Sequence, residues 1–441
     1  MRIRAAVAAL GVLALVAVAC DNEDSGGGGG GGSSEGGSRP GVTDTEIKVG
    51  GVVGKTNLIG QPYEDSQFGA KLYFDKVNAE GGVFDREIVS VGVTDDQSDP
   101  NANVAANRAL VEEEQVFVVI PEMTSTFAGA QYLAEQGTPT FGWNINADWA
   151  EGPNLFGEKG SYLCFECPSL PTSVLATQIG AERAAVFAYG GIPQSEDCAV
   201  GAIRGLENYD IEVPVQDTSL SYGFTDTSAA IEAVRGSNVD ILTTCMDING
   251  TATLAGDIAD AGLEVAVLSP NGYDQETLGD LGDQIEGFYF LAQFWPFEEP
   301  NPPEGMQDYL DAVEDAGRVP SELSLTGWIN AHLLVEGINA AGEDFTQESV
   351  VEAINSMTEP FTAGGILPPT VVWGITDDYP EGAHGPALSG MACVQYVQVQ
   401  DGEFVPVLGE EGKPFICFEG NNEVDQTGVP SIDDPTFLPD D

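Results

Sequence analysis

The chain has 441 residues, and its 71 acidic and 15 basic residues give a formal net charge of −56 at pH 7. A surface this acidic repels nucleic acid and anionic lipid headgroups, so we expect neither a nucleic-acid partner nor electrostatic binding to a membrane surface. Between two low-complexity ends the chain keeps a body of about 380 residues, a size that normally divides into two domains.

The first twenty residues, 1–20, resemble the signal peptide of a bacterial lipoprotein. Arg2 and Arg4 precede an apolar run at 5–19, which is shorter than the roughly 20 apolar residues of a membrane span. The run ends in small residues before Cys20, which would become the lipid-bearing first residue of the mature chain. The alternative is ordinary signal cleavage near Ala19, with Cys20 as a bystander. Both alternatives predict export, and the first predicts lipid anchoring to the bacterial cell membrane.

Both ends of the mature chain are of low complexity. Residues 21–43 contain seven consecutive glycines, at 26–32, together with several serines. Such a segment buries no side chains and would be a flexible tether between a lipid anchor and a folded body. Residues 419–441 are acidic and rich in proline, without hydrophobic periodicity, and we expect a loose tail there.

In the first half of the body, predicted strands alternate with predicted helices. Short runs rich in β-branched residues predict the strands, and apolar residues at helical spacing predict the helices. The expected strands are 47–53, 87–93, 116–120 and a fourth that begins at Pro139, and the expected helices are 68–78, 103–113 and 126–136. This alternation is typical of a parallel sheet with helices on both faces.

The same plan then restarts. The expected strands are 184–188, 211–215, 239–244 and 265–269, and the expected helices are 195–208, 227–235 and 251–261. Later helices are expected at 303–317, 326–341 and 347–356, followed by a β-hairpin at 391–399 and 404–408 around Asp401 and Gly402. We therefore predict an α/β fold of two similar lobes, each a parallel sheet flanked by helices.

The cysteines after Cys20 are even in number, which in an exported chain favours disulfides over free thiols. They are Cys164, Cys167, Cys198, Cys245, Cys393 and Cys417, and six cysteines allow 15 pairings. The first two form a C-x-x-C motif, but no second such motif accompanies it, and His332 and His384 are the only histidines. We expect no metal site and no cofactor.

The sequence contains no clear catalytic motif. Between residues 44 and 418 it lacks G-x-S-x-G and H-E-x-x-H, and the glycine-rich stretch 50–56 is one residue short of a phosphate-binding P-loop. His332 lies in a predicted apolar helix and His384 in a predicted loop, so neither suggests acid–base chemistry. Carboxylates are numerous, but nothing singles out a catalytic pair. We expect a protein that is not an enzyme.

The stretch 74–86 and the residues after it carry a more specific signal. A helix that ends Asn-x-x-Gly-Gly is followed by an arginine, a strand and the pair Asp95 and Asp96. This order resembles the type I periplasmic binding proteins of the branched-chain amino acid (Leu/Ile/Val-binding) family, which are the substrate-binding proteins of ABC transporters. Asp85 stands where the family usually has a glycine before the arginine. The resemblance covers residues 45–418.

The resemblance implies a particular domain organisation. The N-terminal lobe would comprise 44–160 and 286–360, the C-terminal lobe 161–285 and 361–418, and three crossover hinge strands would join them. Hinge closure would capture a ligand between the lobes. Because the tail of the family returns to the second lobe, all six body cysteines would lie there. The preferred pairs are Cys393–Cys417 across the terminal strands, Cys198–Cys245 and Cys164–Cys167.

Ligands of open parallel sheets bind beyond the carboxyl ends of the strands. The candidate ligand-binding residues at those ends are Thr56, Thr124, Ser125, Thr126, Trp143 and Asn144 in the first lobe and Tyr189, Asp247, Tyr273 and Asp274 in the second. The hydroxyls at 124–126 and the helix after them would hold a carboxylate. Trp143 would form an apolar wall, unless it packs in the core, and Asn144 would direct a hydrogen bond. The family holds the ammonium group of an amino acid with a second-lobe carboxylate, a role open to Asp247 or Asp274.

Together these features predict an extracytoplasmic, lipid-anchored receptor. It would capture a small polar ligand, an amino acid or a related compound, in an interlobe cleft and pass it to the permease of an ABC importer. A ligand sensor of the same fold, without transport, predicts the same sequence features. A secreted hydrolase would need a catalytic constellation that the sequence does not display. The resemblance leaves the ligand open, because members of the family handle amino acids, amides, short acids and aromatic compounds.

Overall fold

The computed structural model describes residues 39–57, 60–158, 160, 165–369, 371–375, 386–388, 391–419 and 431–438. The predicted signal peptide with Cys20, most of the tether, Cys164, His384 and most of the acidic tail lie outside these ranges. Within these ranges, no helix combines the length and the apolar composition that a membrane span requires. The same ranges contain no group of three or more side chains placed to bind a metal ion.

The first sheet consists of five parallel strands in the order β2-β1-β3-β4-β5. They are β1 (Glu46–Val53), β2 (Glu87–Asp95), β3 (Val118–Met123), β4 (Thr140–Gly142) and β5 (Leu155–Gly157). β3 is buried along its whole length, as expected for a central strand that is covered on both faces. Because the strands are parallel, their carboxyl ends lie at one edge of the sheet, where a ligand site is expected.

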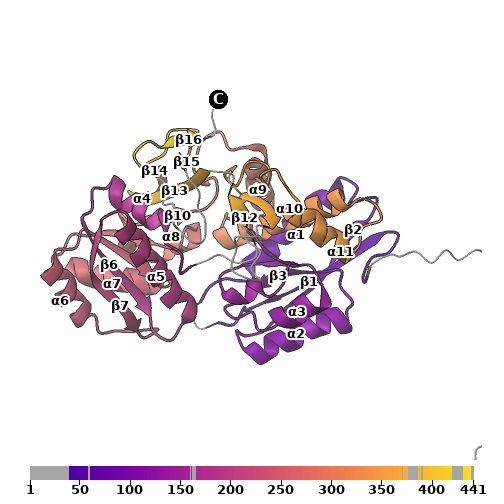
Figure 1. Ribbon diagram of the computed structural model, residues 1–441, viewed down its shortest axis with the longest axis horizontal. Helices are drawn as coiled ribbons and strands as arrows, with labels where there is room; N and C mark the ends of the chain where they lie inside the picture. Colours follow the sequence, from indigo (N-terminus) through magenta and orange to yellow (C-terminus); the bar gives the residue numbers. More distant parts are fainter. Residues whose placement is uncertain are drawn as a thin grey trace, which may run out of the picture. The chain divides into compact units, whose positions relative to one another are not determined.

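Helices cover both faces of the first sheet (Figure 1). They are α1 (Asp65–Ala79), α2 (Pro100–Glu112), α3 (Ala130–Gln136), α9 (Glu304–Asp315), α10 (Glu322–Ala341) and α11 (Gln347–Asn355), with the short 3₁₀ helix η1 (Ala147–Ala150). α2 and α3 pack on one face, and α1 and α10 on the other. A Cβ atom on Gly69 would lie 1.6 Å from the Ser324 carbonyl oxygen, so the close crossing of α1 and α10 requires glycine.

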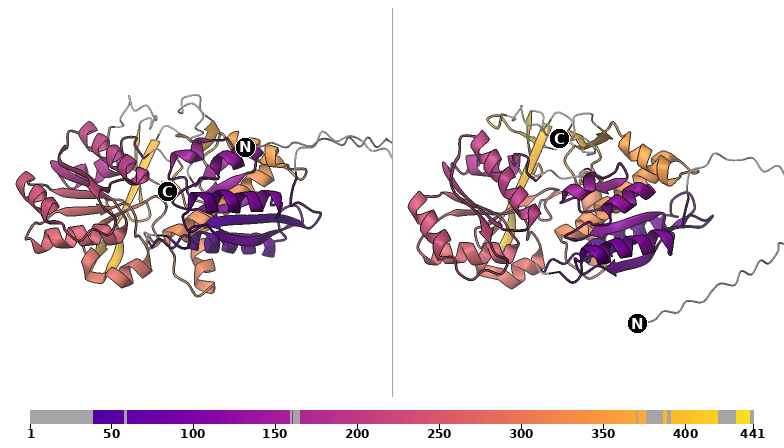
Figure 2. Two further views of the ribbon diagram at one scale, coloured as in Figure 1. Left: turned by 90° about the horizontal axis from the view of Figure 1, so that it is seen from below. Right: turned by 60° about the horizontal axis from the view of Figure 1, so that its bottom comes forward.

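The second sheet has nine strands, in the order β16-β15-β13-β10-β9-β8-β6-β7, with β14 also paired to β13. They are β6 (Arg183–Tyr189), β7 (Glu212–Leu220), β8 (Ile241–Cys245), β9 (Ala266–Ser269), β10 (Tyr289–Ala292), β13 (Met391–Gln400), β14 (Glu403–Val407), β15 (Phe415–Glu419) and β16 (Thr436–Leu438). Figure 2 shows β13, in yellow tones, running beside the pink strands of this sheet. A separate two-stranded sheet pairs β11 (Val371–Ile375) with β12 (Pro386–Leu388).

The helices of the second sheet also divide between its faces. They are α4 (Leu170–Gln178), α5 (Pro193–Asn208), α6 (Ser228–Ser237), α7 (Ile248–Asp260) and α8 (Gln275–Leu281), with the 3₁₀ helix η2 (Gly282–Ile285). The buried side chains of α4 and α5 share one apolar cluster with β6 and β8, and those of α6 and α7 belong to another. The sheet therefore has an apolar core on each side.

The predicted α/β class and the predicted hairpin are confirmed. β13 and β14 pair in antiparallel register around Asp401 and Gly402, whose φ angles of 54° and 78° suit a two-residue hairpin turn. The second sheet is mixed rather than purely parallel, because β13 to β16 add to it in antiparallel register. β10 lies in this sheet too, although the resemblance places 286–360 in the first lobe.

Several element boundaries differ from the prediction for local reasons. The helix expected at 126–136 begins only at Ala130, after a turn in which the Gly129 amide donates a 2.8 Å hydrogen bond to Asn103 Oδ1. α4 was not predicted, because it is buried on most sides and lacks the polar face that makes a helix recognisable. β5, a strand of only three residues, also escaped prediction.

Two of the three expected disulfides are confirmed. Cys198 in α5 bonds to Cys245 at the end of β8, with Cα atoms 5.8 Å apart. Cys393 in β13 bonds to Cys417 in β15, with Cα atoms 4.0 Å apart. The first disulfide therefore joins a covering helix to the second sheet, and the other joins two strands of that sheet. The third expected pair involves Cys164, which lies outside the described residues.

Candidate functional site

The first group of candidate residues follows β3 at the carboxyl edge of the first sheet. Thr124 is 4% exposed, and its hydroxyl has no hydrogen-bond partner among the described residues. The same is true of the buried Thr126 hydroxyl. A buried hydroxyl without a partner is uncommon, because it gives up its hydrogen bonds to water without replacing them. These two hydroxyls therefore have hydrogen-bonding capacity that the described residues leave unused. The N-terminus of α3, by contrast, lies four residues after Thr126 and does not adjoin it.

Tyr63 connects two of the predicted residues. Its hydroxyl lies 3.2 Å from Ser125 Oγ, and its ring centroid lies 5.7 Å from that of Trp143, which is partly buried. Burial raises the pKa of Tyr63 to about 12, so its hydroxyl keeps its proton near neutral pH. Sequence reasoning missed Tyr63, which stands in the turn before α1; an aromatic residue directly after Pro62 was the only signal.

The polar residues after β4 and β1 take different roles. Asn144 is 1% exposed, and its amide donates to the Gly160 carbonyl oxygen at 3.1 Å. Asn146 is also buried, yet neither atom of its amide group has a partner in the described part of the chain. Thr56 is exposed and donates its hydroxyl to Asp95 at 2.9 Å. Asn146, which was not predicted, therefore has more free hydrogen-bonding capacity than Asn144 or Thr56.

A buried polar network lies next to the carboxyl edge of the first sheet. Glu122 is 1% exposed; its Oε1 accepts from Asn103 at 2.7 Å and its Oε2 from Asn107 at 3.2 Å. The same Asn103 amide donates to Asp96 at 2.9 Å. Burial raises the pKa of Glu122 to about 8, so this carboxyl group is mainly protonated at neutral pH. The network fixes the ends of β2 and β3 relative to α2.

In the second sheet, the structure brings Tyr189 and Asp247 together. Tyr189 is the last residue of β6, and Asp247 lies two residues after the neighbouring strand β8. The Tyr189 hydroxyl donates to Asp247 Oδ2 at 2.5 Å. Asp247 also caps α7, because its Oδ1 accepts from the amides of Asn249 at 3.0 Å and Gly250 at 3.3 Å. Asp247 forms no ion pair with a cationic side chain of the described residues.

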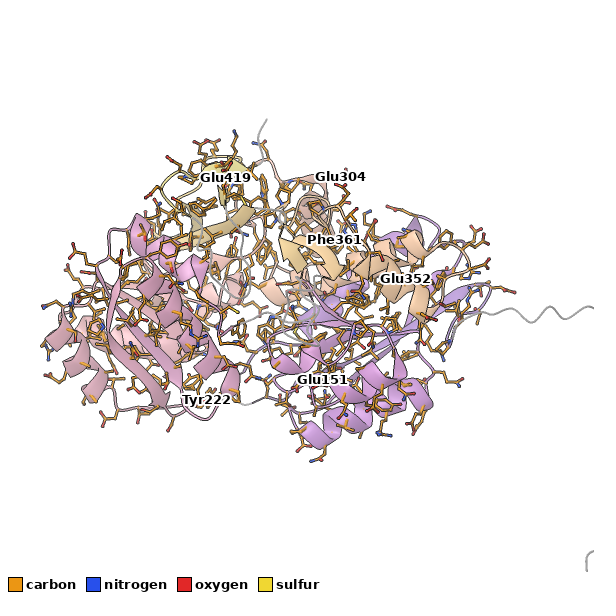
Figure 3. All side chains as sticks on the ribbon, viewed as in Figure 1. Glu151, Tyr222, Glu304, Glu352, Phe361 and Glu419 are labelled. Atoms are coloured by element: carbon orange, nitrogen blue, oxygen red, sulfur yellow. A yellow bond between two sulfur atoms is a disulfide. The ribbon has the colours of Figure 1, made fainter. Side chains whose placement is uncertain are left out.

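Two aromatic residues that were not predicted surround this pair. Tyr222 lies in the loop after β7, is labelled in Figure 3, and meets the Tyr189 ring edge-on at 5.6 Å. Phe224 in the same loop lies 6.5 Å from Tyr189. Tyr222 is 44% exposed, which is unusual for so large an aromatic side chain. Burial and the Asp247 charge both raise the pKa of Tyr222. Tyr222 and Phe224 therefore flank the ring of Tyr189, whose hydroxyl contacts a carboxylate that has no ion pair within the described residues.

The other two second-sheet candidates are engaged in local structure. Tyr273 is fully buried; its hydroxyl donates to Glu298 and accepts from the Phe297 amide at 2.7 Å. Asp274 caps α8 by accepting from the Thr277 amide at 2.7 Å and from the Thr277 hydroxyl at 2.6 Å. Tyr273 and Asp274 thus have structural partners that account for their presence.

Asp274 also contributes to a negative region at the start of α10. Burial, the Asp274 charge and the Glu158 charge raise the pKa of Glu322 to about 8, although the amides of Tyr273 and Gly272 oppose the shift. Glu158 accepts a 2.8 Å hydrogen bond from the Thr326 hydroxyl. Like charges this close favour the uptake of a proton or the approach of a cation.

One hydrogen bond joins the carboxyl edges of the two sheets. Gln194, in the first turn of α5, donates its side-chain amide to the Ser125 carbonyl oxygen at 2.9 Å. The segment after β3 and the segment after β6 are therefore neighbours. A cavity of about 330 Å³ lies elsewhere, beside Tyr396, Pro406 and Glu410, and none of the predicted ligand residues lines it.

Comparison with known proteins gives a family match. The chain matches a family model described as "Periplasmic binding protein" over residues 46–403. No match was found among curated proteins. A substrate-binding protein of an ABC transporter from Aeropyrum pernix has a similar structure, with 19% identity, a TM-score of 0.67, and coverage of 86% of this chain and 97% of that one.

Two further solved structures contain ligands. The branched-chain amino acid transporter substrate-binding protein LivJ from Streptococcus pneumoniae, in complex with isoleucine, has 15% identity and a TM-score of 0.65, covering 82% of this chain and 100% of that one. A solute-binding protein from R. palustris, in complex with benzoate, has 18% identity and a TM-score of 0.63, covering 82% and 95%. At these identities the structural similarity concerns the fold.

Proposed function

Because this chain belongs to the periplasmic binding protein family, we propose that it is an extracytoplasmic receptor that captures a small polar solute for the permease of an ABC importer. The family consists of solute-binding receptors rather than enzymes. The carboxyl ends of parallel strands from two sheets, linked through Gln194 and Ser125, offer the place of capture. The lipidation of Cys20 and the glycine-rich tether at 21–43 are part of the proposal, and they would hold the receptor at the membrane.

The pair of Tyr189 and Asp247 carries the proposal for the chemical class of the solute. A carboxylate without a cationic partner, beside the rings of Tyr189, Tyr222 and Phe224, suits an ammonium group through charge and cation–π attraction. Burial, with the Asp274 and Glu158 charges, keeps Glu322 mainly protonated, and these two charges favour a cationic group as well.

The carboxyl edge of the first sheet offers hydrogen-bond donors for the acidic end of such a solute. The hydroxyls of Thr124 and Thr126 and the Asn146 amide can donate hydrogen bonds to a carboxylate or amide oxygen. An amino acid carries a group for each edge: an ammonium group for Asp247 and a carboxylate for the Thr124 and Thr126 hydroxyls. A closely related amine that keeps a carboxylate or an amide does the same. Isoleucine, the ligand of LivJ, has both groups, whereas benzoate, the ligand of the R. palustris protein, has only the acidic one. We propose a ligand of the first kind.

Thermal unfolding with a panel of solutes tests this proposal. The panel pairs each standard amino acid with its amide and with its deaminated analogue. A solute present at 100 times its dissociation constant should stabilise the receptor by about 2.7 kcal/mol. We expect stabilisation by at least one amine and none by its deaminated analogue. Stabilisation only by deaminated acids, or chemical conversion of a solute, would contradict the proposal.

A further inference from the structure

The first turn of α5 lies where the segments of the second-sheet site converge. Ser195, which is 7% exposed, accepts a 2.8 Å hydrogen bond from the Tyr189 amide and donates its hydroxyl to the Cys245 carbonyl oxygen. Its single hydroxyl therefore connects the last residue of β6 with the last residue of β8. Tyr189 and Asp247 stand at or just beyond these two strand ends.

The Cys198–Cys245 disulfide adds a covalent bond to the same junction. Cys198 lies one helical turn after Ser195 in α5, and Cys245 lies two residues before Asp247. The disulfide therefore prevents α5 from sliding along the end of β8, whereas Ser195 alone would restrain it only through hydrogen bonds.

The first turn of α5 also contacts the loop after β6 and the segment after β3 of the first sheet. The Gly191 amide donates a 2.7 Å hydrogen bond to Glu196 Oε1, which closes the loop after β6. The neighbouring Gln194 reaches the Ser125 carbonyl oxygen. A displacement of this turn would consequently move Tyr189 away from Asp247 and Gln194 away from Ser125 together.

We propose that Ser195 and the Cys198–Cys245 disulfide are positioning groups that keep Tyr189 and Asp247 in the geometry that binds an ammonium group. The proposal rests on the proposed function for its consequence, solute affinity, but its structural part concerns the unliganded protein. Without these groups, the second sheet would fold with a looser arrangement at its carboxyl edge.

The other disulfide provides a matched control. Cys393 and Cys417 join β13 to β15 in the same sheet, on the side opposite β6 and β7 in the strand order. Removal of either disulfide should lower the melting temperature, because each closes a loop of the chain. Only removal of the Cys198–Cys245 bond should change the geometry around Asp247.

Hydrogen exchange of the unliganded protein tests the structural part. In the double variant Cys198→Ser/Cys245→Ser, the amides of Tyr189, Asn249 and Gly250 should exchange about tenfold faster than in the wild type, since they bond to Ser195 and Asp247. In Cys393→Ser/Cys417→Ser they should exchange as in the wild type. Ser195→Ala should raise the exchange rate of the Tyr189 amide. Ser195→Thr, which keeps the hydroxyl, should largely restore the wild-type rate.

Binding of the standard amino acids, tested singly, gives the second readout. For the amino acid that most stabilises the wild type, the dissociation constant should rise about fivefold in Cys198→Ser/Cys245→Ser and in Ser195→Ala, and stay within about twofold in Cys393→Ser/Cys417→Ser. Equal exchange in the two disulfide variants overturns the positioning role. If the first double variant does not fold, unchanged exchange and affinity in Ser195→Ala overturn it instead. Altered exchange without binding of any amino acid contradicts the proposed ligand class alone.

Discussion

The Gln194 side-chain amide donates a 2.9 Å hydrogen bond to the main-chain carbonyl oxygen of Ser125. Gln194 belongs to a helix of the second sheet, and Ser125 follows the central strand of the first sheet. This bond therefore favours the conformation in which the two carboxyl edges adjoin, and a ligand that contacts both edges would be retained by the same conformation.

Substitution Gln194→Ala should accelerate ligand release. One hydrogen bond contributes about 1 kcal/mol, so we expect the dissociation rate to rise about fivefold with little change in the melting temperature. Stopped-flow displacement of a bound amino acid measures this rate. Gln216→Ala is a matched control, because among the described residues the Gln216 side-chain amide donates only within its own strand, to the Val213 carbonyl oxygen at 3.1 Å. Equal dissociation rates in the two variants would refute a role for the Gln194 contact.

Substitution Asp247→Asn should weaken the binding of amines while preserving the fold. Asparagine caps helices about as well as aspartate, so α7 should remain intact. Hydrogen bonds to charged groups contribute about 1.5–3 kcal/mol, so the dissociation constant should rise about tenfold or more. Calorimetric titration checks this. Asp226→Asn is the control, because Asp226 is exposed and its carboxylate accepts a hydrogen bond from the Ser228 amide. An unchanged dissociation constant would exclude Asp247 from the site.

Substitution Gly250→Ala should separate binding from stability. A Cβ atom at this position would lie 2.1 Å from the Tyr189 hydroxyl oxygen, so the ring must move away from Asp247. Alanine is favoured over glycine in a helix by about 1 kcal/mol, which offsets part of the cost to the fold. We therefore expect a small change in unfolding free energy but a dissociation constant raised about fivefold.

The control for this variant lies in the same helix. Gly256→Ala places its Cβ in open space, with no atom within 4 Å. It should stabilise α7 slightly and leave affinity unchanged. A Gly250→Ala variant that binds as tightly as Gly256→Ala would show that the Tyr189–Asp247 contact is dispensable.

Glu122 should make stability depend on pH. Burial raises its folded-state pKa to about 8, whereas an ordinary glutamate in the unfolded chain has a pKa near 4.3. Between these values the folded protein keeps the proton and the unfolded chain has released it. Glu122 therefore lowers stability as pH rises through this window, and its effect levels off above pH 8.

Substitution Glu122→Gln should remove this dependence. The side-chain oxygen Oδ1 of Asn107 has no partner among the described residues. If the Asn107 side-chain amide flips, this oxygen can accept a hydrogen bond from the new glutamine nitrogen. Urea unfolding at several pH values should show that the stability of the variant relative to the wild type increases from about pH 5 to pH 8. The exposed Glu113→Gln should show no such trend. Parallel pH profiles for Glu122→Gln and the wild type would contradict the raised pKa.

Much of the fold was predictable because its signals are local. The apolar, β-branched run in β1 and the spacing of apolar residues in α1 report burial directly, and the Asp401–Gly402 turn specifies its hairpin. The strand that the hairpin joins was not predictable from local patterns, because strand order depends on contacts between segments about 100 residues apart, such as β10 and β13.

The candidate site was only partly predictable for the same reason. Tyr189 and Asp247 were found because both lie near the carboxyl end of a predicted strand, and the structure brings them together. Tyr273 follows a strand in the same way, but its ring packs in the core among Phe294, Phe297 and Phe404. Tyr222 acquires its position only when the loop after β7 folds beside β6, which no local pattern reveals.

The central claim is reversible capture of one small amine, and calorimetric titration with recovery of the bound compound tests it most directly. The amino acid that most stabilises the protein is titrated into the wild type, and the complex is then unfolded and its small-molecule content analysed by mass spectrometry. We expect saturation at one equivalent per chain and recovery of the amino acid chemically unchanged. Recovery of a reaction product, or the absence of saturable binding for every amine in the panel, would contradict the account.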